Sequence, residues 1–294
     1  MVAFPNFLII GAAKSGTTAL YHYLKQHPQV FMPALKEPRF FAHENRPPDW
    51  RGPGDEIYRA ATVTNLVQYV GLFHGADGAR AAGEASTQYL YMERAPERIK
   101  HYAPRARLVA ILRDPAEVAH AVFLHKRREG FEPHKSFERA LAEEDARVRD
   151  GWSPFWFYRR RGFYHEHLRR YFDAFPREQL KVLLYDDFKQ DPRGVMRELY
   201  RFLDVDDSFA PDMTYRPNVS GVPRSRALYR WLERSSAKQA RAGLKSKLLG
   251  GVRAWNLPKP RLAPETRARL VEGYREDILR LQDLLGRDLS RWLR

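Results

Sequence analysis

Short apolar runs alternate with longer amphipathic segments along this chain. Residues 7–10 (FLII) and 107–112 (RLVAIL) contain almost no polar positions, which is typical of strands buried on both faces of a sheet. A third run, residues 180–185 (LKVLLY), follows a segment at 162–175 with the pattern of a helix. Because strands and helices alternate, the pattern predicts an α/β fold in three layers, with a central parallel sheet flanked by helices.

Capping residues give the bounds of further helices. Ser136 is placed to cap a charged amphipathic helix that runs to Arg149, and Asp191 precedes Pro192 at the first position of another helix. The last helix is expected over 264–285, where an apolar stripe is followed by a glycine. These helices are expected to build the fold.

Three segments are less regular. Residues 29–32 predict a short strand, and residues 44–60, rich in proline, glycine and charge, predict a loop. An aromatic cluster lies at residues 152–158. We expect it to pack in the core or under a loop, with stacking on an adenine or a sugar as the alternative.

Composition narrows the class of protein. The chain has 294 residues, of which 44% are hydrophobic, enough for one large core. Since no linker-like segment or internal repeat is present, we expect a single domain over residues 1–294. The formal net charge of +15 favours anionic partners but does not select one. The chain has no cysteine, which excludes disulfides and thiolate metal sites.

A glycine-bounded loop joins the first expected strand to the first expected helix. Its spacing, Gly11-x4-Gly16, is similar to that of a phosphate-binding P-loop, so the three-layer fold is expected to be P-loop-like. Thr17 stands where a nucleotide triphosphatase has its lysine, and Lys14 lies inside the loop. A lysine at this position is placed to meet the bridging oxygen of a donor that carries a single phosphate at the end bound by the loop. A P-loop kinase or NTPase is the alternative interpretation.

The string AAKSGTTAL at residues 12–20 resembles the 5′-phosphosulfate loop of sulfotransferases that use 3′-phosphoadenosine 5′-phosphosulfate (PAPS). The string LRDPAEVAHAVFLH at 112–125 resembles the 3′-phosphate motif of that family, and KEPRFF at 36–41 resembles its acceptor-side motif. The resemblance is to the carbohydrate or heparan sulfate branch. It extends over nearly the whole chain.

The resemblance implies a set of donor-binding residues. Lys14 would stabilise charge on the leaving 5′-phosphate, and Arg113, with Arg224 as a second candidate, would hold the 3′-phosphate. Backbone N–H groups and hydroxyls of the loop would hold the 5′-phosphate; these residues are Ser15, Gly16, Thr17 and Thr18. PAPS would be the co-substrate, and this scheme requires no metal.

The same resemblance implies a catalytic base. Glu37 in the KEPRFF segment would take the proton of an acceptor hydroxyl, or amine, during in-line displacement at sulfur. His43 is a rival, since other sulfotransferases use a histidine. Their histidine lies further along the chain, where His120 and His125 are the comparable residues. The loop-rich segment 44–79 is expected to be an insertion on the acceptor side.

This sequence departs from the family pattern at two places. Ala85 replaces a lysine that faces the acceptor and leaving group in some relatives, and Ala121 replaces a serine that shares the 3′-phosphate. Ser86 and Thr87, or another cation, would have to replace the missing lysine. The missing serine predicts weaker discrimination or a substitute donor.

A strongly basic segment covers residues 216–262, where the stretch from Arg224 to Arg261 contains eleven Lys or Arg and one acid, Glu233. It is interpreted as a lid-like segment over the nucleotide. The alternatives are a patch for an anionic acceptor, a peripheral membrane contact through 224–261, or a solvated helix face.

Partners and location follow from the same features. The acceptor is expected to be a hydroxyl-bearing small molecule, a glycan or a lipid-linked compound. No nucleic acid is expected, although a polyanion-binding protein is a further alternative because of the charge. No apolar run approaches the roughly 20 residues of a spanning helix, and the strand expected at Phe7 leaves no room for a signal peptide. We therefore expect a cytoplasmic protein. Golgi-type relatives of the sulfotransferase family carry a membrane anchor, so the resemblance together with the lack of a spanning run implies a bacterial enzyme.

Overall fold

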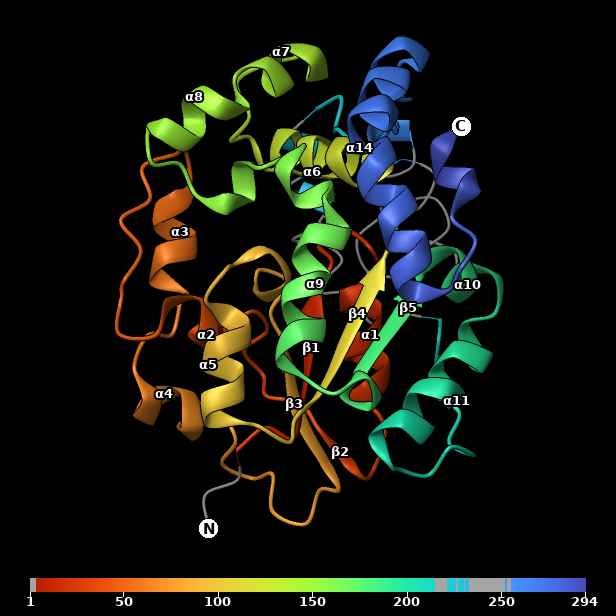
Figure 1. Cartoon of the computed structure of the whole chain (residues 1–294). Coiled ribbons are helices and arrows are strands. Elements are labelled where there is room, and N and C mark those ends of the chain that lie inside the picture. Colours follow the sequence, from red (N-terminus) through yellow and green to blue (C-terminus); the bar gives the residue numbers. More distant parts are fainter. Residues whose placement is uncertain (1–3, 215–220, 226, 230, 233–251, 253–254) are drawn as a thin grey trace.

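Five parallel strands form one sheet in the part of the chain that the structure describes. The computed structural model describes residues 4–214, 221–225, 227–229, 231–232, 252 and 255–294. The sheet order is β2-β3-β1-β4-β5 (Figure 1). The strands are β1 (Phe7–Gly11), β2 (Val30–Phe31), β3 (Ala81–Ala85), β4 (Arg107–Leu112) and β5 (Leu180–Leu184). The predicted central parallel sheet is therefore confirmed.

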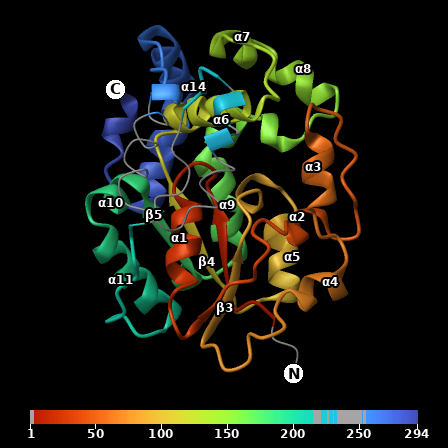
Figure 2. The same cartoon turned by 180° about the vertical axis from the view of Figure 1, so that it is seen from behind.

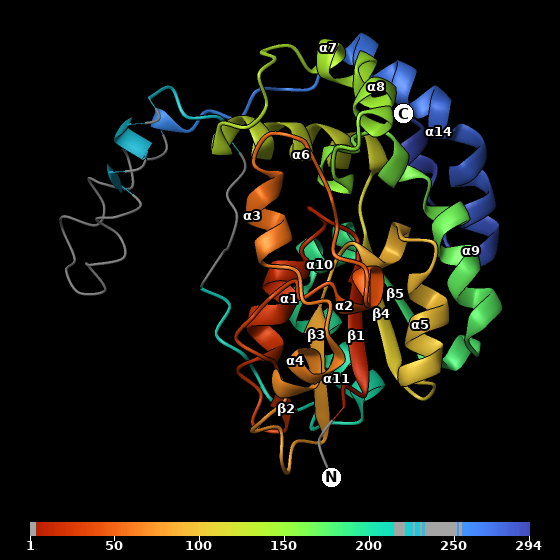
Figure 3. The same cartoon turned by 90° about the vertical axis from the view of Figure 1, so that its left-hand side faces the viewer.

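Helices cover both faces of this sheet, as the views from the front, back and side show (Figures 1, 2 and 3). One face packs against α1 (Thr17–Leu24), α10 (Tyr185–Gln190) and α11 (Pro192–Leu203). The other packs against α2 (Phe40–His43), α4 (Leu66–Gly71), α5 (Ala95–Tyr102), α6 (Pro115–Glu129), α9 (Tyr164–Ala174) and α14 (Pro264–Leu285). The structure thus has the three layers that the sequence predicts.

The two cores follow from strand geometry. Successive side chains of a strand point to opposite faces, so Leu8 and Ile10 enter one core while Phe7 and Ile9 enter the other. All four side chains are fully buried. This explains why the first apolar run has no alternation of polar and apolar positions: a central strand covered on both faces needs none.

Two expectations about local structure were wrong. The segment 44–60 contains α3 (Asp55–Ala60) where a continuous loop was predicted. The predicted single helix 136–149 is divided into α7 (Phe137–Ala142) and α8 (Glu144–Arg149). Glu143 lies between these two helices. Its carboxylate accepts hydrogen bonds from His134 and from Arg147, which fixes the junction to neighbouring parts of the chain.

The remaining elements are short. The 3₁₀ helices are Tyr89–Tyr91, Pro154–Trp156, Arg160–Gly162, Arg177–Gln179 and Ser290–Leu293. Ser136 caps α7 as predicted, since its Oγ accepts from the Arg139 N–H at 3.2 Å, and Asp191 caps α11 through the Gly194 N–H at 2.8 Å. Within the described residues, no helix has the combined length and apolar character needed to cross a membrane.

Glu84 is a fully buried acid near the end of β3, and burial raises its pKa to about 7. The unfolded chain therefore releases this proton at lower pH than the folded chain. We expect the free energy of unfolding to decrease as pH rises from about 4.5 to about 7, by on the order of 3 kcal/mol for this group. Glu84→Gln is expected to remove that decrease, measured by denaturant unfolding at several pH values. Parallel pH profiles for the two proteins would contradict the expectation.

Candidate active site

The loop between β1 and α1 leaves several backbone donors free. Lys14 and Gly16 have positive φ angles, 61° and 104°, and a Cβ at Gly16 would lie 3.3 Å from the Tyr185 ring. In the described part of the chain, no acceptor receives the N–H groups of Gly16, Thr17 and Thr18. Unpaired N–H groups at the start of a helix form a site for a phosphate or sulfate group.

This loop opens on a cavity of about 530 Å³. The cavity lining includes Lys14, Gly16, Thr17 and Thr18. Glu37 and Arg113 line the same cavity, so the structure brings together six of the eight predicted site residues. Ser15 is fully buried outside the cavity lining, and its hydroxyl donates to the Ala13 carbonyl oxygen at 3.4 Å.

Lys14 is held in a strongly cationic environment. Burial lowers its pKa to about 8, with further lowering by the charges of Arg128, Lys36 and Arg113 and an opposing effect of Glu129. Its Nζ has no hydrogen-bond partner among the described residues, whereas its carbonyl oxygen accepts from Arg113 at 3.3 Å. An anionic ligand beside Nζ would raise this pKa again.

Glu37 is oriented by two neighbours. Its carboxylate accepts from the Thr87 N–H at 2.9 Å, from the Thr87 hydroxyl at 3.1 Å and from Lys36 Nζ at 2.8 Å. Burial alone would raise the pKa of Glu37, but the charges of Lys36 and Arg39 and these hydrogen bonds hold it below its ordinary value. The carboxylate is therefore ionised at neutral pH, as a proton acceptor must be.

Arg113 lies at the end of β4 and is held by three contacts. Its Nε donates to Glu117 at 2.9 Å, its Nη1 donates to the Lys14 carbonyl oxygen, and its guanidinium lies 4.9 Å from the centre of the Tyr185 ring. Its position at the carboxyl edge of the sheet, beside the phosphate loop, is where α/β proteins bind nucleotides.

The rival histidines lie in different surroundings from Glu37. His43 does not line the cavity; its Nε2 lies 3.1 Å from Gln88 Oε1, and burial lowers its pKa to about 4. His120 also lies outside the cavity lining and packs against the Phe137 ring.

His125 is the one of the three that does line the cavity. Burial, followed by the charge of Lys14, lowers its pKa to about 2. Its Nδ1 accepts from Arg128 at 2.8 Å, and its Nε2 faces Glu129 at 3.1 Å. Both ring nitrogens are therefore engaged, and this geometry leaves no free nitrogen for an acceptor proton.

The two departures from the family pattern are buried. Ala85 ends β3, and its carbonyl oxygen accepts from the Glu37 N–H at 3.0 Å. Ala121 lies on α6 outside the cavity lining. Ser86 accepts from the Arg39 N–H at 2.9 Å, whereas Thr87 orients Glu37.

The basic segment 216–262 lies largely outside the described residues. Arg224 is described: its guanidinium lies 5.0 Å from the centre of the Trp255 ring, and it does not line the cavity. Its N–H donates to the Asn256 carbonyl oxygen at 2.7 Å. Some of the described residues of this segment project from the body of the protein (Figure 3), whereas Val222 and Leu262 pack against one of the two cores.

Sequence reasoning missed several cavity residues. They include Arg39, Tyr58, Lys126 and Arg161. Phe155 also lines the cavity, and it belongs to the aromatic cluster at 152–158 for which stacking on a ligand was the alternative interpretation. Lys126 did leave a signal, because it follows Val122 by four positions on a helix and so belongs to the face that should be apolar. The others come from segments distant in sequence, and only folding brings them together.

Among the described residues there is no cluster of His, Asp and Glu that could hold a metal ion.

Comparison with known sequences gives a consistent result. Residues 4–282 match the family described as Sulfotransferase domain. Bifunctional heparan sulfate N-deacetylase/N-sulfotransferase 4 of Mus musculus is 28% identical over 305 residues, which cover 99% of this chain and 31% of that protein. The corresponding Drosophila melanogaster protein is 29% identical over 214 residues, covering 68% and 20%. The chain therefore spans less than a third of the length of these relatives.

A solved structure shows the same fold. The sulfotransferase from Alicyclobacillus acidocaldarius superposes with a TM-score of 0.80 and 34% sequence identity, covering 99% of this chain and 100% of that one. The family match extends over most of the chain, and its range includes residues 11–18 and Glu37. This protein belongs to the sulfotransferase domain family.

Proposed function

We propose that this protein transfers the sulfuryl group of PAPS to a hydroxyl or amine of an acceptor. The acceptor oxygen or nitrogen attacks sulfur in line with the leaving group and forms the new bond. The bond between sulfur and the bridging oxygen of the 5′-phosphate breaks, and its electron pair remains on that oxygen. Glu37 takes the acceptor proton, and Lys14 stabilises the negative charge on the leaving phosphate.

One observation carries this proposal: Glu37 and Lys14 line the same cavity as the free N–H groups at the start of α1. A carboxylate can accept a proton, and an ammonium beside unpaired N–H groups can bind the leaving phosphate. Thr17 stands where a Walker loop has its lysine. Its side chain is uncharged and so cannot neutralise the β- and γ-phosphates of a nucleotide.

The acceptor is proposed from the relatives. Proteins that match this chain are named for N-sulfation of heparan sulfate, and we propose a glycan amine or hydroxyl as the acceptor here. A 530 Å³ cavity with Tyr58 and Phe155 in its wall offers apolar ring faces against which a sugar can pack.

The proposal is tested by donor binding and by transfer. Calorimetry should show binding of 3′-phosphoadenosine 5′-phosphate (PAP), the product of the donor, and much weaker binding of ATP with Mg²⁺. Incubation with ³⁵S-labelled PAPS and N-desulfated heparin should label the glycan. Preference for ATP with Mg²⁺ would support a kinase or NTPase and would overturn the proposal.

Arg113 is proposed to hold the 3′-phosphate, and AMP provides a matched ligand that lacks this group. Arg113→Ala is expected to weaken PAP binding about tenfold to a hundredfold, because a hydrogen bond to a charged group contributes about 1.5–3 kcal/mol. AMP affinity should change little. Calorimetry with both ligands checks the expectation. An equal loss for PAP and AMP would show that Arg113 acts elsewhere on the nucleotide or only supports the loop.

A further inference from the structure

Lys126 is a buried ammonium group with no hydrogen-bond partner in the part of the chain that the structure describes. The residue is 1% exposed and lines the cavity. Its backbone is firmly placed at the end of α6, where its carbonyl oxygen accepts from the N–H groups of Gly130 and Phe131, both at 3.1 Å. A buried charge without a partner costs free energy, so this arrangement requires an explanation.

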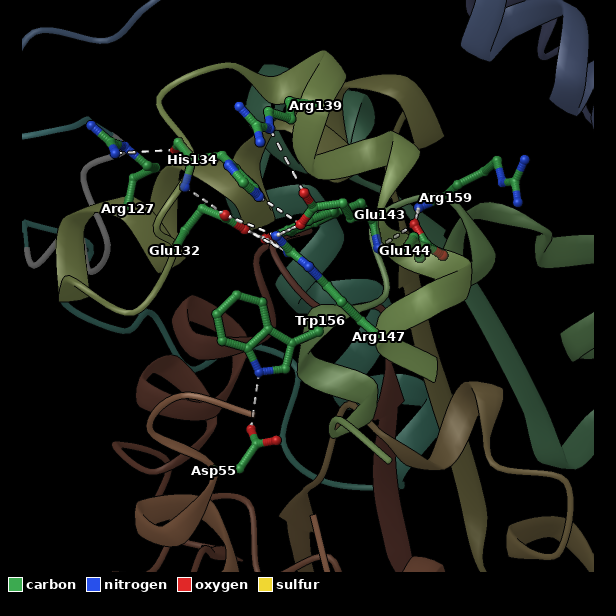
Figure 4. Close-up of polar contacts among 11 residues, drawn as sticks. Asp55, Arg127, Glu132, His134, Arg139, Glu143, Glu144, Arg147, Trp156 and Arg159 are labelled. Carbon is green, nitrogen blue, oxygen red and sulfur yellow. Dashed lines mark hydrogen bonds and ion pairs between the residues drawn. The ribbon is translucent and has the colours of Figure 1, made fainter. Parts of the chain in front are cut away.

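The nearby carboxylates are already engaged by other groups. Asp55 accepts from Trp156 Nε1 at 3.1 Å (Figure 4). It also accepts from the hydroxyl and N–H of Ser153 at 2.6 and 2.8 Å. Figure 4 also shows Glu132 turned toward Arg147, with which it forms two hydrogen bonds of 2.7 and 3.0 Å.

The third nearby carboxylate, Glu129, accepts from the Tyr58 hydroxyl at 3.0 Å and faces His125. All three acids act on Lys126 through their charge, yet none of them forms a hydrogen bond or an ion pair with it. The hydrogen-bonding capacity of the ammonium is therefore left unused.

Aromatic rings surround the Lys126 ammonium. Its Nζ lies 4.5 Å from the centres of both the Tyr58 and Trp156 rings and 5.4 Å from that of Phe155. Such contacts stabilise a cation but accept none of its N–H hydrogen bonds.

Two further cations, Arg39 and Arg161, lie in the same wall. They are 5% and 4% exposed. Neither forms an ion pair with a carboxylate among the described residues. Their described hydrogen bonds go to neutral oxygen atoms. This wall of the cavity therefore holds three buried cations that form no ion pair with a carboxylate among the described residues.

We infer that Lys126, together with Arg39 and Arg161, binds an anionic group of the acceptor, a carboxylate or a sulfate, at a distance from the reacting atom. The inference rests on the proposed function, since it concerns the acceptor of that reaction. Lys126 is then a specificity-determining cation for acidic acceptors. It supplies a positive charge in a chain that lacks the lysine expected at Ala85.

The position of Lys126 favours the acceptor over the donor. Its Nζ lies over the rings of Tyr58, Phe155 and Trp156. These rings come from α3 and from the 3₁₀ helix Pro154–Trp156, and not from residues 11–18 or from the strand end with Arg113. Burial lowers the pKa of Lys126 to about 8, and a bound anion would raise it again.

Inorganic sulfate is the probe that tests this inference. Calorimetry would measure sulfate binding to the free protein and to the PAP-saturated protein, for the wild type and for Lys126→Met, which keeps the length of the side chain without its charge. We expect Lys126→Met to weaken sulfate binding to the PAP-saturated protein about tenfold to a hundredfold, as for a lost charged hydrogen bond. PAP affinity should stay the same. Lys135→Met removes the same charge from an exposed position outside the cavity and should change neither.

Thermal unfolding gives an independent readout. Because an unpaired buried charge is destabilising, Lys126→Met is expected to raise the Tm. Unchanged sulfate binding in Lys126→Met, whatever its Tm, would overturn the inference. Lys126 would then be a structural cation of the aromatic cluster. Weakened PAP binding would overturn it by assigning Lys126 to the donor. Failure of the wild type to bind PAP would count against the proposed function, while the sulfate titration of the free protein would still decide the role of Lys126.

Discussion

Glu37→Gln is expected to lower kcat by about 10²- to 10⁴-fold, the usual contribution of a general base, while PAP affinity stays nearly constant. Glutamine keeps the shape of the side chain and an oxygen that can accept from the Thr87 N–H. It cannot take up the acceptor proton. The loss should therefore fall on the chemical step, as measured by labelled sulfate transfer beside calorimetry with PAP.

The pH profile provides a second measurement of the same role. The charges of Lys36 and Arg39 hold the pKa of Glu37 below its ordinary value, and the base works only when ionised. Protonation of Glu37 should therefore lower the activity only below about pH 4.5, provided that the protein remains folded. The residual activity of Glu37→Gln should not show this decrease at acidic pH. Glu56→Gln, the same change at an exposed position of α3, is the control. Turnover at the wild-type rate in Glu37→Gln would show that another group accepts the proton.

The parts of the site that sequence could predict are those built from neighbouring residues. Lys14, Gly16 and Thr17 share one loop, and a strand followed by a glycine-bounded loop and a helix needs no distant contact to define it. Arg113 could be predicted because it directly follows an apolar run, and the ends of parallel strands face the ligand site.

Other features depend on contacts between distant segments. Helix α3 lies in a segment rich in proline and glycine, and its first residue, Asp55, is anchored by Ser153 and Trp156, about a hundred positions away. The orientation of Glu37 by Thr87 is likewise a contact across 50 positions. Local patterns carry no information on such pairs, so neither α3 nor the part of the cavity wall formed by Arg39, Tyr58, Lys126 and Arg161 could be predicted.

Lys14→Met is expected to lower kcat by about 10²- to 10³-fold, the cost of removing one group that stabilises charge in a transition state. Methionine keeps most of the length of the side chain and the same backbone, so the loop with its positive φ angles should retain its shape. PAP affinity should also fall, because the product carries the full charge of the leaving phosphate. Lys25→Met, which removes a charge at the exposed end of α1, should leave both quantities unchanged.

Proton uptake can connect this effect to Lys14 itself. Burial lowers the pKa of Lys14 to about 8, so at pH 8.5 a substantial part of the free protein carries a neutral lysine. A bound phosphate raises that pKa, and PAP binding should then take up protons. Calorimetry at pH 8.5 in two buffers with different ionisation enthalpies measures this uptake. It should be present in the wild type and in Lys126→Met and much reduced in Lys14→Met; equal uptake in all three proteins would show that the proton goes to another group and that Lys14 does not meet the phosphate.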